Sequence, residues 1–135
     1  MKKIAILTVS DSRTLDSDTS GKLIAMKMAN AGLSVVDRVI VNDDIVNIQT
    51  AYLQLEQQAI DIIITNGGTG VAQRDVFCVH FPVTAGFNYR NQLTYCLPGS
   101  QNACQTALNK LILPEYEHLL FESSSQRKEV HHHAH

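Results

Sequence analysis

The chain has 135 residues and a mass of 14.9 kDa, which is the size of a single domain. Hydrophobic residues make up 44% and charged residues 18%, a balance that argues against disorder or a fibrous repeat. The formal net charge of −2 and pI of about 6.3 argue against a protein that binds nucleic acid or anionic lipid. Since no apolar run approaches the roughly 20 residues that cross a bilayer, and residues 4–9 end too early for a signal peptide, we predict a cytoplasmic protein.

The first part of the chain alternates short apolar runs with a helical pattern. Residues 3–9 form a β-branched run that is typical of a buried strand. Residues 19–31 have apolar side chains at helical spacing, with a capping residue among positions 18–20 and Gly32 where a helix stop belongs. Residues 34–41 predict a second strand, which two charged side chains place nearer an edge of the sheet.

A second helix and a third strand follow. Asp43 and Asp44 open the helix, whose predicted apolar stripe comprises Ile45, Ile48, Tyr52 and Leu55. Residues 60–65 are the most strand-like run in the chain, and the sequence Asn-Gly-Gly-Thr-Gly at 66–70 ends it abruptly.

The pattern is weaker after Asp75. Residues 93–97 predict a further strand, which the turn at 98–100 ends; a helix follows, and Pro114 begins a last short helical piece through about Phe121. Strands that alternate with helices in this way favour right-handed βαβ units. The predicted fold class is therefore α/β: a three-layer, doubly wound, mostly parallel sheet with helices on both faces.

The predicted domain comprises residues 1–122, and residues 123–135 form a polar tail that ends in a histidine-containing tract. A metal-binding tract is one interpretation of these histidines. A disordered or tag-like tail is the favoured one, because nothing nearby would hold the imidazoles in place.

The three cysteines, Cys78, Cys96 and Cys104, are an odd number without Cys-x-x-Cys spacing. This pattern predicts reduced thiols and no zinc site. Cys96 falls in a predicted strand and Cys104 in a predicted helix, positions that suit core residues better than a nucleophile.

Polar or glycine-rich turns follow each predicted strand, at residues 10–13, 42–44, 66–70 and 98–100. In an open α/β sheet, ligands bind outside the carboxyl ends of the strands, so these turns predict one ligand site. The glycine turn could present backbone N–H groups to phosphate oxygens, or it could be only a tight strand-to-helix turn. It matches neither the P-loop nor the dinucleotide fingerprint. Ser100 is predicted first as a helix N-cap and alternatively as an anion contact.

Acidic residues near these turns could hold a metal ion. Asp44 is predicted as a helix cap. Asp75 follows the glycine turn where no helix pattern begins, so it could hold Mg²⁺ between protein and phosphate. Arg74 beside it could be a phosphate clamp or a solvated surface residue. The residues alone thus predict a phosphate-ligand site on a doubly wound domain.

Six segments in this order resemble the MoaB/MogA family of molybdenum-cofactor biosynthesis proteins: AILTVSDSRT, DTSG, VDRVIVNDDI, ITNGGTG, RDV and YCLPGSQNAC. The resemblance covers residues 3–120 and is closest to the MoaB branch. It implies a molybdopterin-binding domain and an adenylyltransferase that moves AMP from Mg-ATP to the molybdopterin phosphate. It also implies a homotrimer or, in the MoaB branch, a homohexamer, with molybdopterin and ATP as partners, no nucleic acid and no membrane.

The resemblance also implies roles for individual residues. Asp43 and Asp75 match the family's functional acids and would hold the Mg²⁺ cofactor. The residues that match its substrate- and nucleotide-binding positions are Ser10, Asp11, Thr19, Ser20, Gly21, Gly67, Gly68, Thr69, Gly70, Pro98, Gly99 and Ser100.

One segment departs from the family pattern. In the family, a Thr-Pro pair and a long helical stretch follow the Arg-Asp pair, whereas here residues 76–82 follow Asp75 and the pattern resumes near Thr84. The missing helical piece helps to wall the pterin pocket. An alternative is therefore a non-catalytic pterin- or nucleotide-binding member of the same pathway. A third interpretation is an unrelated flavodoxin-like phosphate-ligand module.

Overall fold

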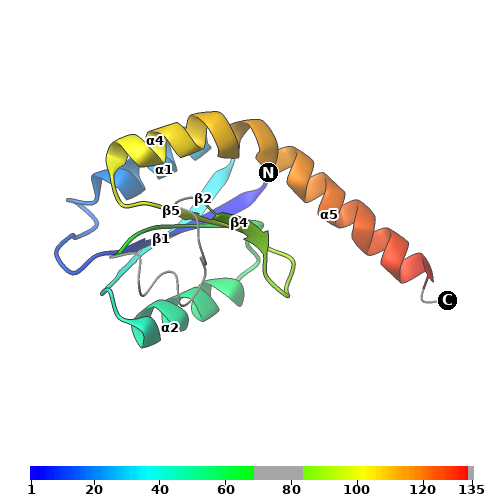
Figure 1. Ribbon diagram of the computed structural model, residues 1–135, viewed down its shortest axis with the longest axis horizontal. Helices are drawn as coiled ribbons and strands as arrows, with labels where there is room; N and C mark the ends of the chain where they lie inside the picture. Colours follow the sequence, from blue (N-terminus) through cyan, green and yellow to red (C-terminus); the bar gives the residue numbers. More distant parts are fainter. Residues whose placement is uncertain (69–83, 134–135) are drawn as a thin grey trace.

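The computed structural model describes residues 1–68 and 84–133. In chain order the elements are β1 (Lys3–Val9), α1 (Thr19–Asn30), β2 (Ser34–Val41), α2 (Ile45–Glu56), β3 (Ile62–Gly67), β4 (Thr84–Phe87), β5 (Leu93–Leu97), α4 (Gln101–Ala107), a π-helical turn (Leu108–Ile112) and α5 (Leu113–His133). The strands form one sheet in the order β2-β1-β3-β5-β4 (Figure 1). All pairings are parallel except that of β4 with β5.

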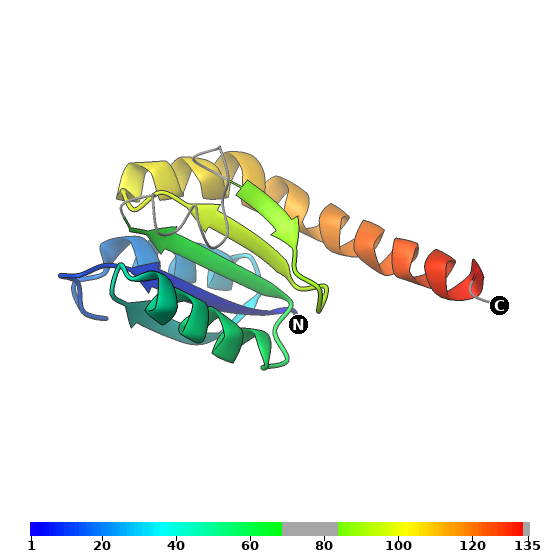
Figure 2. The ribbon, with the colours of Figure 1, turned by 60° about the horizontal axis from the view of Figure 1, so that its bottom comes forward.

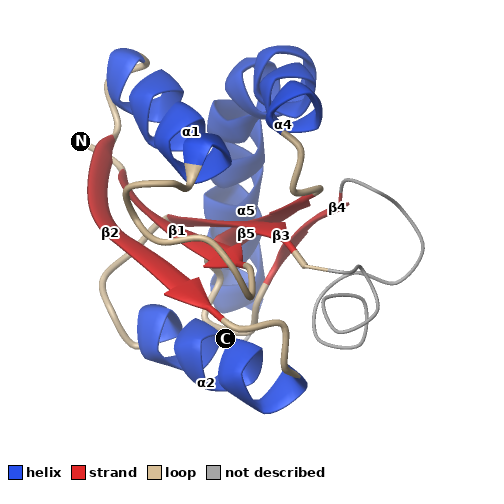
Figure 3. Ribbon diagram, turned by 90° about the vertical axis from the view of Figure 1, so that its left-hand side faces the viewer, coloured by secondary structure: helices blue, strands red, loops and turns tan. Residues whose placement is uncertain are grey.

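Helices cover both faces of this sheet, as the strand–helix alternation predicts (Figure 3). Alternate β1 residues face opposite sides: Ile4 and Ile6 lie in a cluster with side chains of α1, α4 and α5, and Ala5 and Leu7 lie in a cluster with side chains of α2. The predicted α/β fold class with a mostly parallel sheet is confirmed.

Side chains fix where three helices begin. Asp18 caps α1, Asp44 caps α2 and Ser100 caps α4; in each case a side-chain oxygen accepts a hydrogen bond from the backbone N–H three residues on, at 2.9, 3.0 and 3.1 Å respectively. Gly32 follows α1 with a φ of 93°. The capping residues and the helix stop predicted from the sequence are therefore present, because short polar side chains satisfy N–H groups that a helix start leaves open.

The strand predictions hold with two differences. β2 is an edge strand, as its two charges predict, but β3 begins and ends two residues later than the predicted run at 60–65. β4 was not predicted, because its four residues, Thr-Ala-Gly-Phe, lack the alternation that signals a strand; it pairs antiparallel with β5 at the other edge (Figure 2).

Two helix predictions need correction. The stripe of α2 does not include Ile45, which is 38% exposed, because the helix packs on the sheet only from Ile48 onward. The last helix does not end near Phe121 but continues to His133 and leads away from the sheet (Figure 1). Residues 115–133 contain neither glycine nor proline, so no helix stop interrupts them. The tail predicted as residues 123–135 is therefore helical as far as His133.

No helix within residues 1–68 and 84–133 combines the length and the hydrophobicity that a membrane span requires.

Candidate functional site

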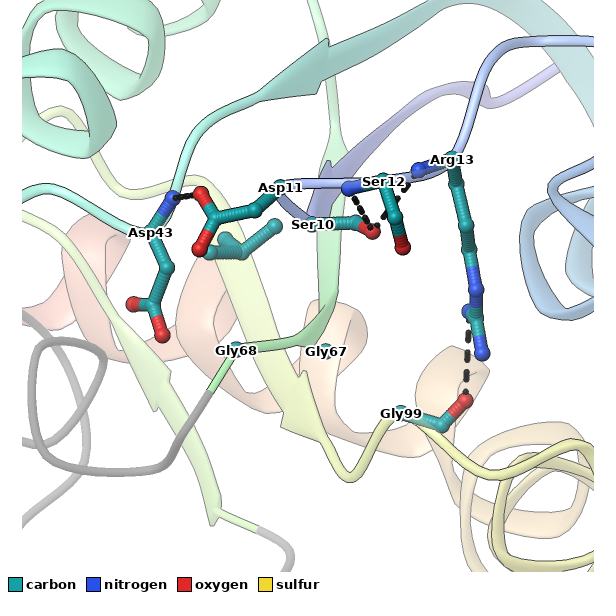
Figure 4. Close-up of a pocket in the computed structure, with 9 residues that line it drawn as sticks. Ser10, Asp11, Ser12, Arg13, Asp43, Gly67, Gly68 and Gly99 are labelled. Atoms are coloured by element: carbon teal, nitrogen blue, oxygen red, sulfur yellow. Dashed lines mark hydrogen bonds between the residues drawn. The ribbon is translucent and has the colours of Figure 1, made fainter.

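A pocket of about 330 Å³ lies at the carboxyl ends of the strands (Figure 4). Four strands, β1, β2, β3 and β5, end at this pocket, and the residues at or just after their ends line it. Its lining residues are Val9, Ser10, Asp11, Ser12, Arg13, Asp43, Gly67, Gly68 and Gly99. The pocket therefore occupies the rim at which the sequence predicts a ligand site.

Glycines form the floor of this pocket. Gly67 and Gly68 have φ values of 92° and 84°, in the left-handed region that favours glycine. A Cβ on Gly67 would lie 2.4 Å from the carbonyl oxygen of Val9. The glycines at the end of β3 thus allow its backbone to lie close to the end of β1 and keep side chains out of the pocket.

The Ser10 hydroxyl folds the loop after β1. Its Oγ accepts hydrogen bonds from the backbone N–H groups of Ser12 (3.3 Å) and Arg13 (3.1 Å). The backbone N–H of Ser10 in turn donates to the carbonyl oxygen of Val41, at the end of β2 (2.9 Å). This local turn brings the side chains that follow to the pocket.

Two carboxylates lie side by side at one end of the pocket. Asp11 Oδ1 accepts a hydrogen bond from the backbone N–H of Asp43 at 2.9 Å, and Figure 4 shows both carboxylates on the same side. Asp44, the next residue, points its carboxylate to the start of α2 instead. The neighbouring acids therefore differ in role: Asp43 lines the pocket and Asp44 caps a helix.

Arg13 lies at the opposite end of the pocket from these carboxylates (Figure 4). Its Nη1 donates to the carbonyl oxygen of Gly99 at 3.4 Å and lies 3.7 Å from Asp18 Oδ1. Among the described lining residues Arg13 is the one cation. Arg13 belongs to the turn at residues 10–13 that the sequence predicts at the site, but the sequence assigns no binding role to Arg13 itself.

A buried polar network lies behind the pocket wall. Asp18, 1% exposed, accepts hydrogen bonds through Oδ2 from Thr8 Oγ1 (2.7 Å) and Arg38 Nη2 (3.4 Å). Asn66 Nδ2 donates to Thr8 Oγ1 at 3.0 Å. Asn66 begins the turn predicted at residues 66–70, whereas Thr8, Asp18 and Arg38 were not predicted as site residues. The polar side chain of Thr8 inside an otherwise apolar strand was the signal for this network.

The three predicted site residues at the start of α1 do not line the pocket. Thr19 is exposed. Ser20 is fully buried, and its Oγ donates to the carbonyl oxygen of Gly99 at 2.8 Å. Gly21 is packed under Asp18, since a Cβ on it would lie 2.1 Å from Asp18 Oδ2. Ser20 and Gly21 therefore support the site from behind.

Two predicted residues after β5 also lie outside the lining. The Pro98 carbonyl oxygen accepts a hydrogen bond from the Cys104 thiol at 3.1 Å. Ser100 caps α4, which was the first interpretation of that residue. The remaining predicted site residues, together with Arg74, lie outside the residues that the structure describes: Thr69, Gly70 and Asp75.

Cys96 and Cys104 are buried, in the core positions that the sequence predicts. Burial raises the pKa of Cys104 to about 11, against the smaller, opposing effect of a hydrogen bond with Ser20. A thiol that stays protonated at neutral pH is a poor nucleophile, so Cys104 is a core residue.

The carboxylates suit a magnesium–phosphate ligand better than a metal held by protein alone. No group of three or more His, Cys, Asp or Glu side chains gathers as a metal site within the described parts of the chain. Asp11 and Asp43 provide two carboxylates at the pocket. Mg²⁺ is commonly held by one or two carboxylates with water and substrate phosphates completing its shell, and this donor set fits that arrangement.

Comparisons with known proteins agree with the fold and the sequence motifs. Residues 5–81 match the family described as "Probable molybdopterin binding domain". The chain is 32% identical to molybdenum cofactor biosynthesis protein B of Bacillus anthracis, over 90% of each chain, and 35% identical to the protein of that name in Staphylococcus aureus strain COL, over 89% of this chain and 90% of the relative. A crystal structure of a molybdenum cofactor biosynthesis protein B superposes with a TM-score of 0.80 at 31% identity, covering 92% of this chain and 96% of that one. The chain belongs to the MoaB/MogA family of molybdopterin-binding domain proteins.

Proposed function

We propose that this protein acts in molybdenum cofactor biosynthesis by transferring AMP from Mg-ATP to the phosphate of molybdopterin. The role in this pathway is supported by the family and by the names of its relatives. The transfer step, ATP and Mg²⁺ are our proposal, as are a cytoplasmic location and a homotrimeric or homohexameric assembly.

The division of charge in the pocket is the observation that carries this proposal. Asp11 and Asp43 lie at one end, Arg13 at the other, and the glycines between them leave room for a ligand (Figure 4). A magnesium-bound phosphate chain carries both features that such a pocket recognises: a cation for the carboxylates and anionic oxygens for the guanidinium.

The proposed reaction is a displacement at the α-phosphorus of ATP. An oxygen of the pterin phosphate forms the new bond to that phosphorus, the bond to the bridging oxygen of the β-phosphate breaks, and pyrophosphate leaves with the electron pair. Asp43, with Asp11 beside it, would hold Mg²⁺, which neutralises charge on the phosphate oxygens. The pterin phosphate is already an anion, so no side chain has to remove a proton from it. Asp75 remains a predicted second acid.

A non-catalytic, ligand-binding role in the same pathway is the second candidate. The alignment with the Bacillus anthracis relative runs over 152 positions, although it covers 90% of a chain of only 135 residues. It therefore includes positions at which the relative has residues that this chain lacks, in line with the shortened segment predicted after Asp75. A missing part of the pocket wall would reduce turnover more than it reduces nucleotide binding.

A radiolabel assay separates the two candidates. Purified protein is incubated with molybdopterin, MgCl₂ and ATP labelled in the α-phosphate, and the adenylylated pterin is separated chromatographically. Labelled product above the level of an Asp43→Asn control supports adenylyl transfer. Calorimetric binding of Mg-ATP without product supports the non-catalytic candidate, and the absence of both product and binding rejects both candidates.

A further inference from the structure

The Arg13 guanidinium is anchored through one of its three nitrogens. The hydrogen bond to the Gly99 carbonyl oxygen and the ion pair with Asp18 both involve Nη1. In the described part of the chain, Nη2 and Nε of Arg13 form no hydrogen bond or ion pair. The side chain is 32% exposed and lines the pocket, so these donors are available to a ligand.

Asp18 fixes the direction of this guanidinium from behind the pocket. Its Oδ1 accepts from the Gly21 backbone N–H at 2.9 Å on the same side as Arg13, and Thr8 donates to Oδ2 at 2.7 Å. The carboxylate is 1% exposed and also contacts Arg38, so it has little freedom to turn. A rigid carboxylate that holds one end of a guanidinium leaves the other end preorganised for an anion.

We propose that Arg13 binds a phosphate or pyrophosphate group of the ligand through Nη2 and Nε, and that Asp18 is the positioning residue that orients Arg13 for this contact. A guanidinium with two neighbouring donors matches two oxygens of a phosphate. The inference rests on the proposed function only in taking this pocket as the ligand site; it requires anion binding and no turnover.

Inorganic pyrophosphate with MgCl₂ is the probe, titrated calorimetrically into the full-length protein. Arg13→Gln should weaken the affinity roughly tenfold to hundredfold, since a charge-assisted hydrogen bond is lost. Arg13→Lys should restore only part of the affinity, because an ammonium lacks the two-donor geometry. Arg90→Gln is the matched control: Arg90 is exposed and lies between β4 and β5, at the opposite end of β5 from Gly99, so the affinity should not change.

A double-mutant cycle tests the positioning role of Asp18. Asp18→Asn keeps an oxygen to cap α1 but removes the charge; it should weaken pyrophosphate binding severalfold when Arg13 is present and by less than about twofold when Arg13 is Gln. Thr8→Val is the second variant, for use if Asp18→Asn does not fold, because it removes the hydrogen bond that fixes Asp18 and retains the carboxylate. Its effect on affinity should likewise depend on Arg13. Equal losses with and without Arg13 would mean a merely structural role.

Three results would overturn the inference: no saturable pyrophosphate binding by the unsubstituted protein, unchanged affinity in Arg13→Gln, or additive effects in the cycle. The proposed function fails separately. Arg13-dependent binding without adenylylated pterin would reject adenylyl transfer alone, whereas transfer at an unchanged KM for Mg-ATP in Arg13→Gln would reject this inference alone.

Discussion

Gly67 and Gly99 lie in contact at the floor of the pocket: a Cβ built on Gly99 would be 3.0 Å from the Cα of Gly67. Gly67 is the last residue of β3, and Gly99 lies two residues after the end of β5, the strand that pairs with β3 in parallel. A side chain on Gly99 would therefore press on the backbone of Gly67, and one on Gly67 would press on the Val9 carbonyl oxygen at the end of β1. The shape of the pocket therefore depends on a backbone contact that only glycines permit.

Gly67→Ala should lower the free energy of unfolding by more than about 2 kcal/mol. A positive φ alone costs an alanine roughly 1–2 kcal/mol, and the new Cβ would also lie 2.4 Å from the Val9 carbonyl oxygen. Urea unfolding followed by circular dichroism measures this loss. Gly32→Ala is the matched control, since Gly32 has a φ of 93° but no atom within 4 Å of its Cβ position. Equal losses in the two variants would contradict the close contact at Gly67.

Asp43→Asn should reduce adenylyl transfer on the order of 100-fold and leave the unfolding midpoint nearly unchanged. Asp43 lines the pocket beside Asp11, so the loss of its charge removes an electrostatic contact with the reacting group. Stability is little affected, because Asp43 does not cap a helix. Turnover of α-labelled ATP and a thermal melt of the same sample provide the two measurements.

The neighbouring acid provides the control for that substitution. Asp44→Ala removes the carboxylate that accepts from the Asn47 backbone N–H at the start of α2, and should cost about 1 kcal/mol of stability. Its transfer rate at saturating substrate should stay within about twofold of the original. If the variants exchange these phenotypes, Asp44 holds the metal and the assignment of the pair is wrong.

Most helices and strands of the fold could be predicted from the sequence, because each has local signals such as apolar periodicity and capping residues. The Asp44 and Ser100 caps and the edge position of β2 could be inferred from residue type and spacing alone, and the cap of α1 was narrowed to positions 18–20, of which Asp18 is the one. β4 could not, since a four-residue edge strand is defined by its pairing with β5 and carries no pattern of its own.

The candidate site was predictable to a different extent. Chain order places the turns after the strands at one rim, which is enough to expect Ser10, Asp43 and Gly67 at a common pocket. Whether a side chain at a turn faces the ligand or the core depends on three-dimensional packing. Ser20, which was expected to bind ligand, turned out to be buried against the Gly99 carbonyl oxygen, and the role of Arg13 required the contacts with Gly99 and Asp18.

Ser20→Ala should lower the free energy of unfolding by about 1 kcal/mol, because the Gly99 carbonyl oxygen loses the hydrogen bond that the buried hydroxyl donates at 2.8 Å. Thr19→Ala, one residue earlier, removes an exposed hydroxyl and should change stability by less than about 0.5 kcal/mol. Chemical denaturation of the two variants side by side tests the difference. A larger loss for Thr19 than for Ser20 would contradict the buried orientation of Ser20.

Alkaline pH should destabilise the protein through Cys104. The pKa of this thiol is about 11 in the folded protein, and an unfolded cysteine titrates near 8.5. Above pH 8.5 the unfolded chain therefore releases this proton more readily than the folded protein, which stabilises the unfolded state. The contribution of the Cys104 thiol to the free energy of unfolding is full below about pH 8.5 and is lost as the pH rises to 11. The pKa values of Tyr52 and Tyr95 are also raised by burial, so their contributions are lost in the same direction above about pH 10.

Cys104→Ala isolates the thiol from the tyrosines. The variant is less stable than the original at pH 7, because a buried side chain is shortened, but it lacks the group that titrates. Between pH 8 and pH 11 the free energy of unfolding of the unsubstituted protein should fall by roughly 2–3 kcal/mol more than that of the variant. Denaturant titrations at four pH values in this range measure the difference. Parallel pH profiles would mean that the Cys104 thiol ionises as readily in the folded protein as in the unfolded chain, which would contradict its burial beneath the turn at Pro98.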